Sequence, residues 1–90
     1  MFSGEEQTVT LRCANRMAGV VLDRFGQELT LFPEGDGYFT VRVPVAVSPQ
    51  FFAWVTGLDN QVHILAPAAV LEEYRQYLTA ILQTMDGVAK

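Results

Sequence analysis

Apolar and polar residues alternate along two stretches of the chain, residues 8–13 and residues 38–47. A period of two places the apolar side chains on one side of an extended backbone, so each stretch predicts a strand with one buried face. Residues 28–34 and 62–65 predict two further strands, and a glycine-rich turn joins the strand over 28–34 to the next one as a hairpin. Pro44 cannot donate to a strand ladder, so we expect the pairing to stop or bulge at that residue.

Three other stretches have apolar residues at the 3.6-residue spacing of a helix that buries one face. The first follows Asn15, the expected N-cap, and ends at Gly26, while the second begins at Ser48. The third begins at Pro67 and spans about 18 residues. The apolar stripe of this last helix consists of Val70, Leu71, Tyr74, Leu78, Ile81, Leu82 and Met85.

The resulting order, β-α-β-β-α-β-α, predicts an α+β fold: a ferredoxin-like βαββαβ antiparallel sheet with an additional C-terminal helix. In this arrangement both crossover helices cover one face of the sheet, and the first and third strands are neighbours at its centre. We expect the last helix to pack on the open face or the sheet edge, or to reach a neighbouring molecule. Residues 8–86 are expected to form a single domain, after a linker from a missing upstream domain at residues 1–7 and before a C-terminal tail at residues 87–90.

Composition and charge narrow the classes of protein further. Half of the 90 residues are apolar and 18% are charged, which provides enough apolar surface for a core and argues against disorder. The net charge of −4 disfavours a self-sufficient DNA-binding module, which is usually basic. No apolar run approaches the length of a transmembrane helix, and no signal peptide precedes the first strand. A single cysteine fits a reducing cytoplasm, where we expect the protein to be located.

Little in the sequence supports catalysis or the binding of a metal or a cofactor, and we do not expect the protein to be an enzyme. His63 lies within a short apolar strand, where we expect a partly buried histidine with a satisfied hydrogen bond. Cys13 ends a strand on its apolar side, where a lone cysteine behaves as a small hydrophobic residue. The cysteine, histidine and acidic residues form no metal-binding motif. A small dimeric ferredoxin-like enzyme with His63 in its sheet cavity stays open as an alternative.

Candidate ligand-binding residues lie on the face of the sheet away from the crossover helices. Arg12 and Arg42 project from the adjacent first and third strands on this face. Tyr38 and Thr40 lie beside them, and two arginines near an aromatic ring and hydroxyls can hold a carboxylate or a phosphate. The alternative is that both arginines are solvated, or paired with the acidic residues 72–73 of the last helix.

Aromatic residues on the last two helices are candidates for a protein interface. Phe51, Phe52 and Trp54 are too many large rings for one narrow helix face, so we expect part of this aromatic surface to be exposed. The same two alternatives, an exposed ring and a ring packed in the core, apply to Tyr77 on the last helix. We therefore predict that Phe52, Trp54 and Tyr77 contact a second copy of the protein, and core packing is the alternative for Phe51 and Trp54.

An ordered series of six segments covers essentially the whole chain and resembles one known family. The segments are FSGE (residues 2–5), VTLRC (9–13), VLDRFG (21–26), DGYFTV (36–41), VAVSPQFFAWV (45–55) and VHILAP (62–67). In this order they are similar to the C-terminal extension, or WCX domain, of WYL-domain transcriptional regulators of the DeoR-like and YafY-like type. No single segment is diagnostic, because the family is identified by the ordered series.

The resemblance implies a non-catalytic module of a bacterial, cytoplasmic and commonly dimeric regulator. In such regulators an N-terminal winged helix-turn-helix reads DNA, a central WYL domain senses a signal, and the extension helps to form the dimer and to complete the sensory surface. The suspected effectors are nucleotides or nucleic acids, and no cofactor is implied. Because the chain carries neither upstream part, we expect a C-terminal fragment that does not read operator DNA alone and does not bind a membrane. A purely structural assembly domain without a ligand is the alternative function.

Overall fold

The two alternating stretches form the central strands of the structure. The computed structural model describes residues 6–88, and its elements follow the predicted order β-α-β-β-α-β-α. The strands are β1 (Glu6–Ala14), β2 (Phe32–Glu34), β3 (Tyr38–Ala46) and β4 (Val62–Ala66). The helices are α1 (Ala18–Phe25), α2 (Pro49–Thr56) and α3 (Ala68–Val88), with short 3₁₀ turns at Asn15–Met17 and Asp59–Gln61.

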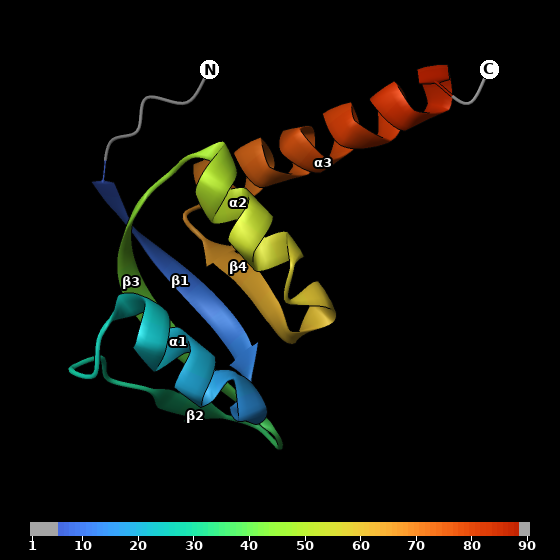
Figure 1. Cartoon of the computed structure of the whole chain (residues 1–90). Helices are drawn as coiled ribbons and strands as arrows, with labels where there is room; N and C mark the ends of the chain where they lie inside the picture. Colours follow the sequence, from blue (N-terminus) through green and yellow to red (C-terminus); the bar gives the residue numbers. More distant parts are fainter. Residues whose placement is uncertain (1–5, 89–90) are drawn as a thin grey trace.

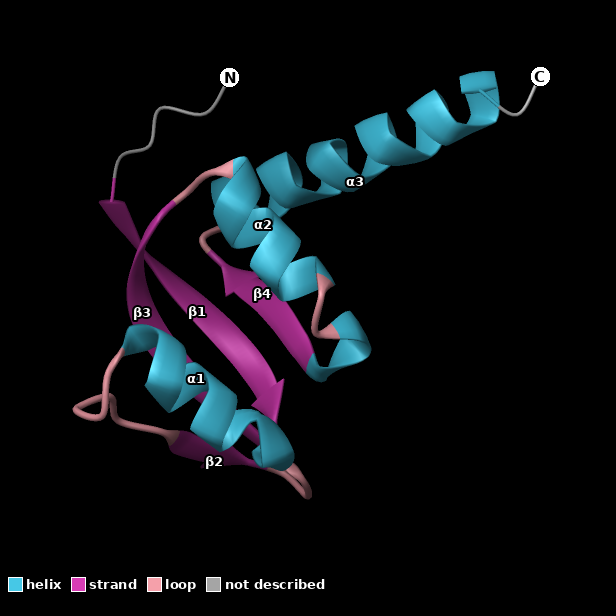
Figure 2. Cartoon of the chain, viewed as in Figure 1, coloured by secondary structure: helices cyan, strands magenta, loops and turns pink. Residues whose placement is uncertain are grey.

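The strands form one antiparallel sheet in the order β2-β3-β1-β4, so β1 and β3 are neighbours at its centre. Helices α1 and α2 both lie on one face of this sheet (Figure 1 and Figure 2). The arrangement confirms the predicted α+β fold, a sheet of the ferredoxin-like type followed by an additional C-terminal helix.

The core lies between the sheet and its two crossover helices, because alternation puts the apolar residues of β1 and β3 on the same side. Val9, Leu11 and Cys13 of β1 are fully buried. The other core residues are Val21, Phe39, Val41, Val43, Val45, Val47, Phe51, Phe52, Val55, Val62, Ile64 and Val70. Valine dominates the strands, where a β-branched side chain packs well on a half-buried pleated surface. The apolar faces predicted for these two strands are therefore confirmed.

Pairing between β1 and β3 continues through Pro44, which corrects the expectation that it would stop or bulge there. Thr8 faces Pro44 in a register that is unbroken along all nine residues of β1. On its other side β3 pairs with β2 only over residues 38–40. At Pro44 the strand thus has a neighbour on one side alone. The unbroken register is compatible with proline because the ring nitrogen can face the free side, where no ladder hydrogen bond is lost.

Helix α2 begins at Pro49, directly after the predicted cap Ser48, and connects α3 to the core. The Ser48 hydroxyl accepts a hydrogen bond from the backbone N–H of Phe51, which satisfies one of the free donors at the start of the helix. The ring of Phe52 is fully buried, and its centre lies 5.3 Å from the ring of Tyr74 and 5.4 Å from that of Tyr77. These ring contacts hold the first half of α3 against α2.

Only the first half of α3 packs on the domain. Val70 is buried, and the helix contacts β4 and α2. The second half extends away from the sheet (Figure 1), and the molecule is 45 Å long but only 28 Å and 22 Å across. The predicted apolar stripe is therefore divided, because beyond Tyr77 its side chains are exposed. These exposed residues are Leu78, Ile81, Leu82 and Met85.

Two further local predictions are wrong. The strand expected from residue 28 onward forms only at Phe32–Glu34, because Leu29 and Leu31 pack against the core from an irregular segment. Asn15 does not cap α1 through its side chain but begins a 3₁₀ turn, and neither this turn nor α1 has a side-chain hydrogen bond at its N-cap. Neither error changes the order of the elements.

Replacing Phe52 by alanine is expected to lower the free energy of unfolding by about 3–5 kcal/mol, because a large ring is lost from the junction of α2 and α3. Urea denaturation followed by circular dichroism measures this change. Phe32→Ala is the matched control, since the Phe32 side chain is 52% exposed and its loss should change the free energy by less than about 0.5 kcal/mol. Equal losses in the two variants would contradict the placement of Phe52 in the core.

Candidate functional site

The face of the sheet opposite α1 and α2 carries the polar residues of the alternating strands, and we call it the open face. On β1 and β3 the burial pattern alternates, with Arg12, Tyr38 and Thr40 half-buried and Arg42 exposed. The register places Arg12 opposite Thr40, and Arg42 opposite Thr10. The structure thus brings the four predicted ligand-binding residues onto one face of two adjacent strands.

Arg12 crosses the open face from β1 toward β2. Its guanidinium carbon lies 4.1 Å from the centre of the Tyr38 ring, in a cation–π contact. Its Nε donates a hydrogen bond of 2.9 Å to Oε1 of Glu34, and this ion pair joins β1 to β2 across the intervening strand β3. The carboxylate that pairs with Arg12 is therefore that of Glu34 and not one from residues 72–73 of the last helix.

Arg42 is the unpaired cation of the open face. It makes no hydrogen bond or ion pair with any residue from 6 to 88. On β3 it lies two residues after Thr40, whereas the Arg12 guanidinium lies over Tyr38, two residues before Thr40. The two arginines consequently form two separate cationic positions on the same face, and they do not converge as a single clamp.

Two residues of the open face were missed by the sequence analysis. Glu34 lies on β2 opposite Tyr38, and Phe32, which is 52% exposed, lies opposite Thr40. The sequence feature from which both positions could have been predicted is the tight turn at residues 35–37, where Gly35 and Gly37 have positive φ. A hairpin closed by this turn pairs Glu34 with Tyr38, so the register could have been followed back along β2.

His63 lies on β4 opposite Arg12 in the strand register. It is exposed, which corrects the expectation of a partly buried histidine, but it has the expected hydrogen-bond contact. Its Nε2 lies 2.8 Å from the carbonyl oxygen of Asn60. No carboxylate is hydrogen-bonded to this ring in the described part of the chain, so His63 has no partner there that would orient it as a general base.

Cys13 has an environment that disfavours reactivity. It is fully buried, and burial raises the pKa of its thiol from 9.0 to about 11. A thiol with a raised pKa is almost entirely protonated near neutral pH and is therefore a poor nucleophile. Among the described residues there is also no group of three histidine, cysteine or acidic side chains that could hold a metal ion.

The three residues predicted for an interface have different surroundings. Phe52 is fully buried in the core, so it cannot itself touch a second copy in this fold. Trp54 is half-buried and meets the ring of Phe25 edge-on, with ring centres 5.2 Å apart. Tyr77 is half-buried against Phe52, next to the part of α3 that extends from the domain. Of these three residues, Trp54 and Tyr77 therefore offer partly exposed aromatic surface, and Phe52 does not.

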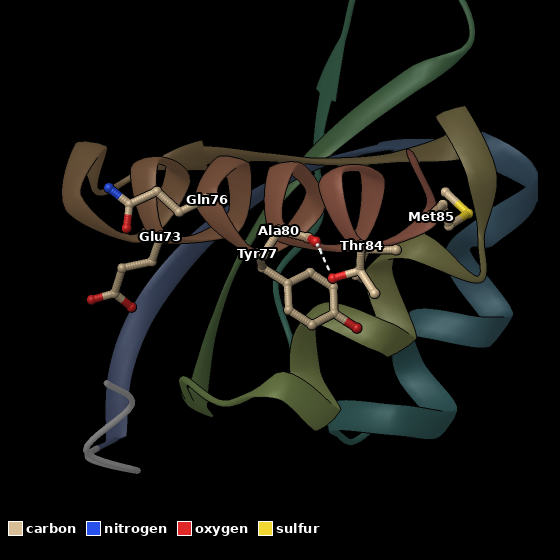
Figure 3. A pocket seen from close by; sticks show the side chains of 7 residues that line it. Glu73, Gln76, Tyr77, Ala80, Thr84 and Met85 are labelled. Carbon is tan, nitrogen blue, oxygen red and sulfur yellow. Dashed lines mark hydrogen bonds between the residues drawn. The ribbon is translucent and has the colours of Figure 1, made fainter. Parts of the chain in front are cut away.

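A broad hollow follows α3. It is lined by Glu73, Gln76, Tyr77, Ala80, Ile81, Thr84 and Met85. All of these side chains belong to the same helix, and Figure 3 shows the labelled ones along one side of it. Because the lining comes from no second element, the hollow is the bare side of a helix. It offers a surface to another chain and not the enclosed concave site that small molecules occupy.

One comparison with known proteins gives a match. The family model of the WCX domain matches residues 5–82, which is most of the chain. No curated protein and no solved structure matches the chain. Between residues 6 and 88, none of the helices has the length and apolar composition of a membrane-spanning segment.

Cys13 is expected to react slowly with iodoacetamide in the folded protein near pH 8. With a pKa of about 11, only about one thiol in a thousand is ionised at that pH. Mass spectrometry of the alkylated protein measures the rate, and unfolding in urea should restore the rate of an ordinary cysteine. Rapid alkylation of the folded protein would show that the thiol is reachable and ionised.

The raised pKa of the Cys13 thiol also predicts how the free energy of unfolding depends on pH. The thiol of Cys13 ionises at a lower pH in the unfolded chain than in the folded one, so its contribution to stability is complete below about pH 9 and is lost as the pH rises through about 11. The free energy of unfolding should therefore fall more steeply in this range for the wild type than for Cys13→Ala. Equal slopes would contradict the raised pKa.

Proposed function

The chain belongs to the WCX domain family, and from this membership we propose that it is the non-catalytic C-terminal regulatory module of a bacterial WYL-type transcriptional regulator. In this proposal the module joins two copies of the regulator, while the winged helix-turn-helix and WYL domains upstream read DNA and sense a signal. The observation that carries the proposal is the apolar stripe on the second half of α3, which the domain leaves uncovered.

From its packed first half into its exposed second half, α3 has the residue spacing of a helix that pairs with another helix. Apolar residues recur at alternating intervals of three and four, the spacing of the two core positions in a coiled coil. These residues are Leu71, Tyr74, Leu78, Ile81 and Met85. Leu78 and Ile81 are 37% and 41% exposed, and Leu82 and Met85 are 55% and 56% exposed. A continuous row of exposed apolar side chains is typical of an interaction surface.

A second copy of α3 in antiparallel orientation fits this stripe. If Leu78 of one helix faces Ile81 of the other, the same register places Tyr74 opposite Met85, and a two-fold axis repeats both pairs. One flank of the stripe, formed by Tyr77 and Thr84, is uncharged, so no like charges meet there. The two domains then lie at opposite ends of the helix pair.

Ile81→Lys is expected to weaken association of the protein at least about tenfold, because an unpaired ammonium would be buried in the apolar seam. Sedimentation equilibrium over a range of protein concentrations measures the dimer dissociation constant.

Gln83→Lys is the matched control, since Gln83 is exposed on the side of α3 away from the stripe and gains the same charge. It should dimerise as the wild type does. A wild type that stays monomeric at every concentration, or equal weakening by the two lysines, would contradict pairing through the stripe.

We also propose that the open face binds an anionic effector, a nucleotide or a nucleic-acid-like molecule. The support is a set of side chains that face solvent together. Arg42 is exposed and has no partner among the described residues, Thr40 is the next open-face residue along β3, and Tyr38 lies beyond Thr40 under the Arg12 guanidinium. The Phe32 ring, opposite Thr40, provides an exposed aromatic surface of the kind on which bases stack.

Nucleotides or single-stranded oligonucleotides are expected to raise the melting temperature of the wild type in proportion to the logarithm of their concentration once they exceed the dissociation constant. A thermal-shift titration measures this rise. Arg42→Ala should reduce it, and Arg12→Ala/Arg42→Ala should abolish it, because the cations of the open face are removed.

Arg16→Ala is the control, since Arg16 is exposed at the turn before α1 and its loss changes the net charge by the same amount as that of Arg42. If Arg16→Ala and Arg42→Ala reduce the rise equally, the effect is one of overall charge and not of a site. If no ligand stabilises the wild type, the open face is a solvated surface and the module is an assembly domain alone.

A further inference from the structure

We propose that Glu34 is an internal occupant of an oxyanion site on Arg12, and that an external phosphate or carboxylate group binds Arg12 by displacing it. This inference rests on the proposed function of the open face as an anion-binding surface. It adds the identity of the group that competes with an external anion for Arg12, and it gives Glu34 a regulatory role at the site.

A carboxylate already contacts the Arg12 guanidinium through a single point. Oε1 of Glu34 accepts from Nε at 2.9 Å, and the two Nη atoms of Arg12 form no hydrogen bond with any described residue. A guanidinium can donate two parallel hydrogen bonds to one carboxylate or phosphate, and this two-point contact is the stronger form. Glu34 therefore makes the weaker version of a contact that an unrestrained oxyanion can make in full.

The side chain of Glu34 is weakly held. The exposed fractions of the Arg12 and Glu34 side chains are 38% and 48%, and ion pairs this exposed contribute little to stability. Glu34 ends a strand of only three residues, all of them exposed. The turn that follows contains Gly35 and Gly37 at positive φ. No packing in the core thus keeps the Glu34 carboxylate beside Arg12.

Arg12, by contrast, keeps its position when its partner leaves. It lies on β1, a central strand with neighbours on both sides, and its guanidinium lies over the Tyr38 ring at 4.1 Å. This cation–π contact does not involve Glu34. Exchange of the carboxylate for an external oxyanion therefore moves Glu34 and leaves the binding group in place.

The exchange also has a consequence for the edge of the sheet. While Glu34 is paired, Arg12 is neutralised, and Arg42 carries the positive charge of the open face that no described residue pairs. An anion that reaches Arg12 breaks the side-chain link between β1 and β2, which lie on either side of β3. Binding of an anion to Arg12 is in this way coupled to how firmly the short strand β2 is held to the rest of the sheet.

The Nε–H resonance of Arg12 in nuclear magnetic resonance spectra reports on this exchange directly. We would titrate the wild type and Glu34→Gln with inorganic phosphate, and with acetate in a parallel series. Phosphate should bind Glu34→Gln about two- to fivefold more tightly than the wild type, because a neutral amide competes poorly for the guanidinium. The same order of affinities with acetate would extend the site to carboxylates, and a response to phosphate alone would restrict it to phosphate groups.

Asp36→Asn is the matched control. It removes the same charge from the turn next to Glu34, and Asp36 forms no hydrogen bond or ion pair with Arg12. It should bind phosphate with nearly the affinity of the wild type.

Equal affinities of Glu34→Gln and Asp36→Asn would overturn the displacement, while phosphate binding by the wild type would still support the open face as an anion site. Weaker binding by Glu34→Gln would also overturn it, because Glu34 would then be holding Arg12 in place for the ligand. If neither anion shifts the Arg12 resonance in any of the three proteins, the displacement and the proposed effector site both fail.

Discussion

Burial of one side of the two central strands is the constraint on which the rest of the structure depends. Successive residues of a strand point to opposite faces, and in β1 and β3 every residue on one face is apolar over the length that α1 and α2 cover. Burial of this face drives folding, and the same alternation forces the intervening residues to the other side. Arg12, Tyr38, Thr40 and Arg42 are gathered on one surface for this reason. The candidate site is thus a geometric consequence of how the core forms.

The parts of the structure that could be predicted are those that depend on neighbouring residues alone. Period-two spacing defines β1 and β3, and the serine before Pro49 defines the start of α2. The parts that could not be predicted depend on contacts between distant segments. Leu29 follows a strand-like pattern but packs from an irregular segment, and Glu34 reaches Arg12 only because the hairpin places β2 on the far side of β3 from β1. Phe52 is buried because α3 returns over α2, which the spacing of aromatic residues on α2 does not reveal.

The two surfaces with proposed roles are separated by the core. The ring of Phe52 lies against Tyr74 and Tyr77, so the position of α2 sets the direction in which α3 leaves the domain. Helix α3 leaves the domain next to α2 and extends away from the sheet (Figure 1), while strand alternation places the arginines on the open face. In the proposed dimer, pairing through α3 therefore leaves both open faces accessible. Assembly and ligand binding can act in one module without competing for the same surface.

The free side of β3 beyond Thr40 bears on how the protein behaves when it is concentrated. A bare strand edge is a template for a strand of another molecule, and proteins with such edges tend to grow into fibre-like aggregates. Here Pro44 interrupts the donors along that edge, and the outermost strand β2 contains Pro33. An incoming strand meets a broken row of hydrogen-bonding groups at both places. Sheet-to-sheet polymerisation through this edge is thereby disfavoured.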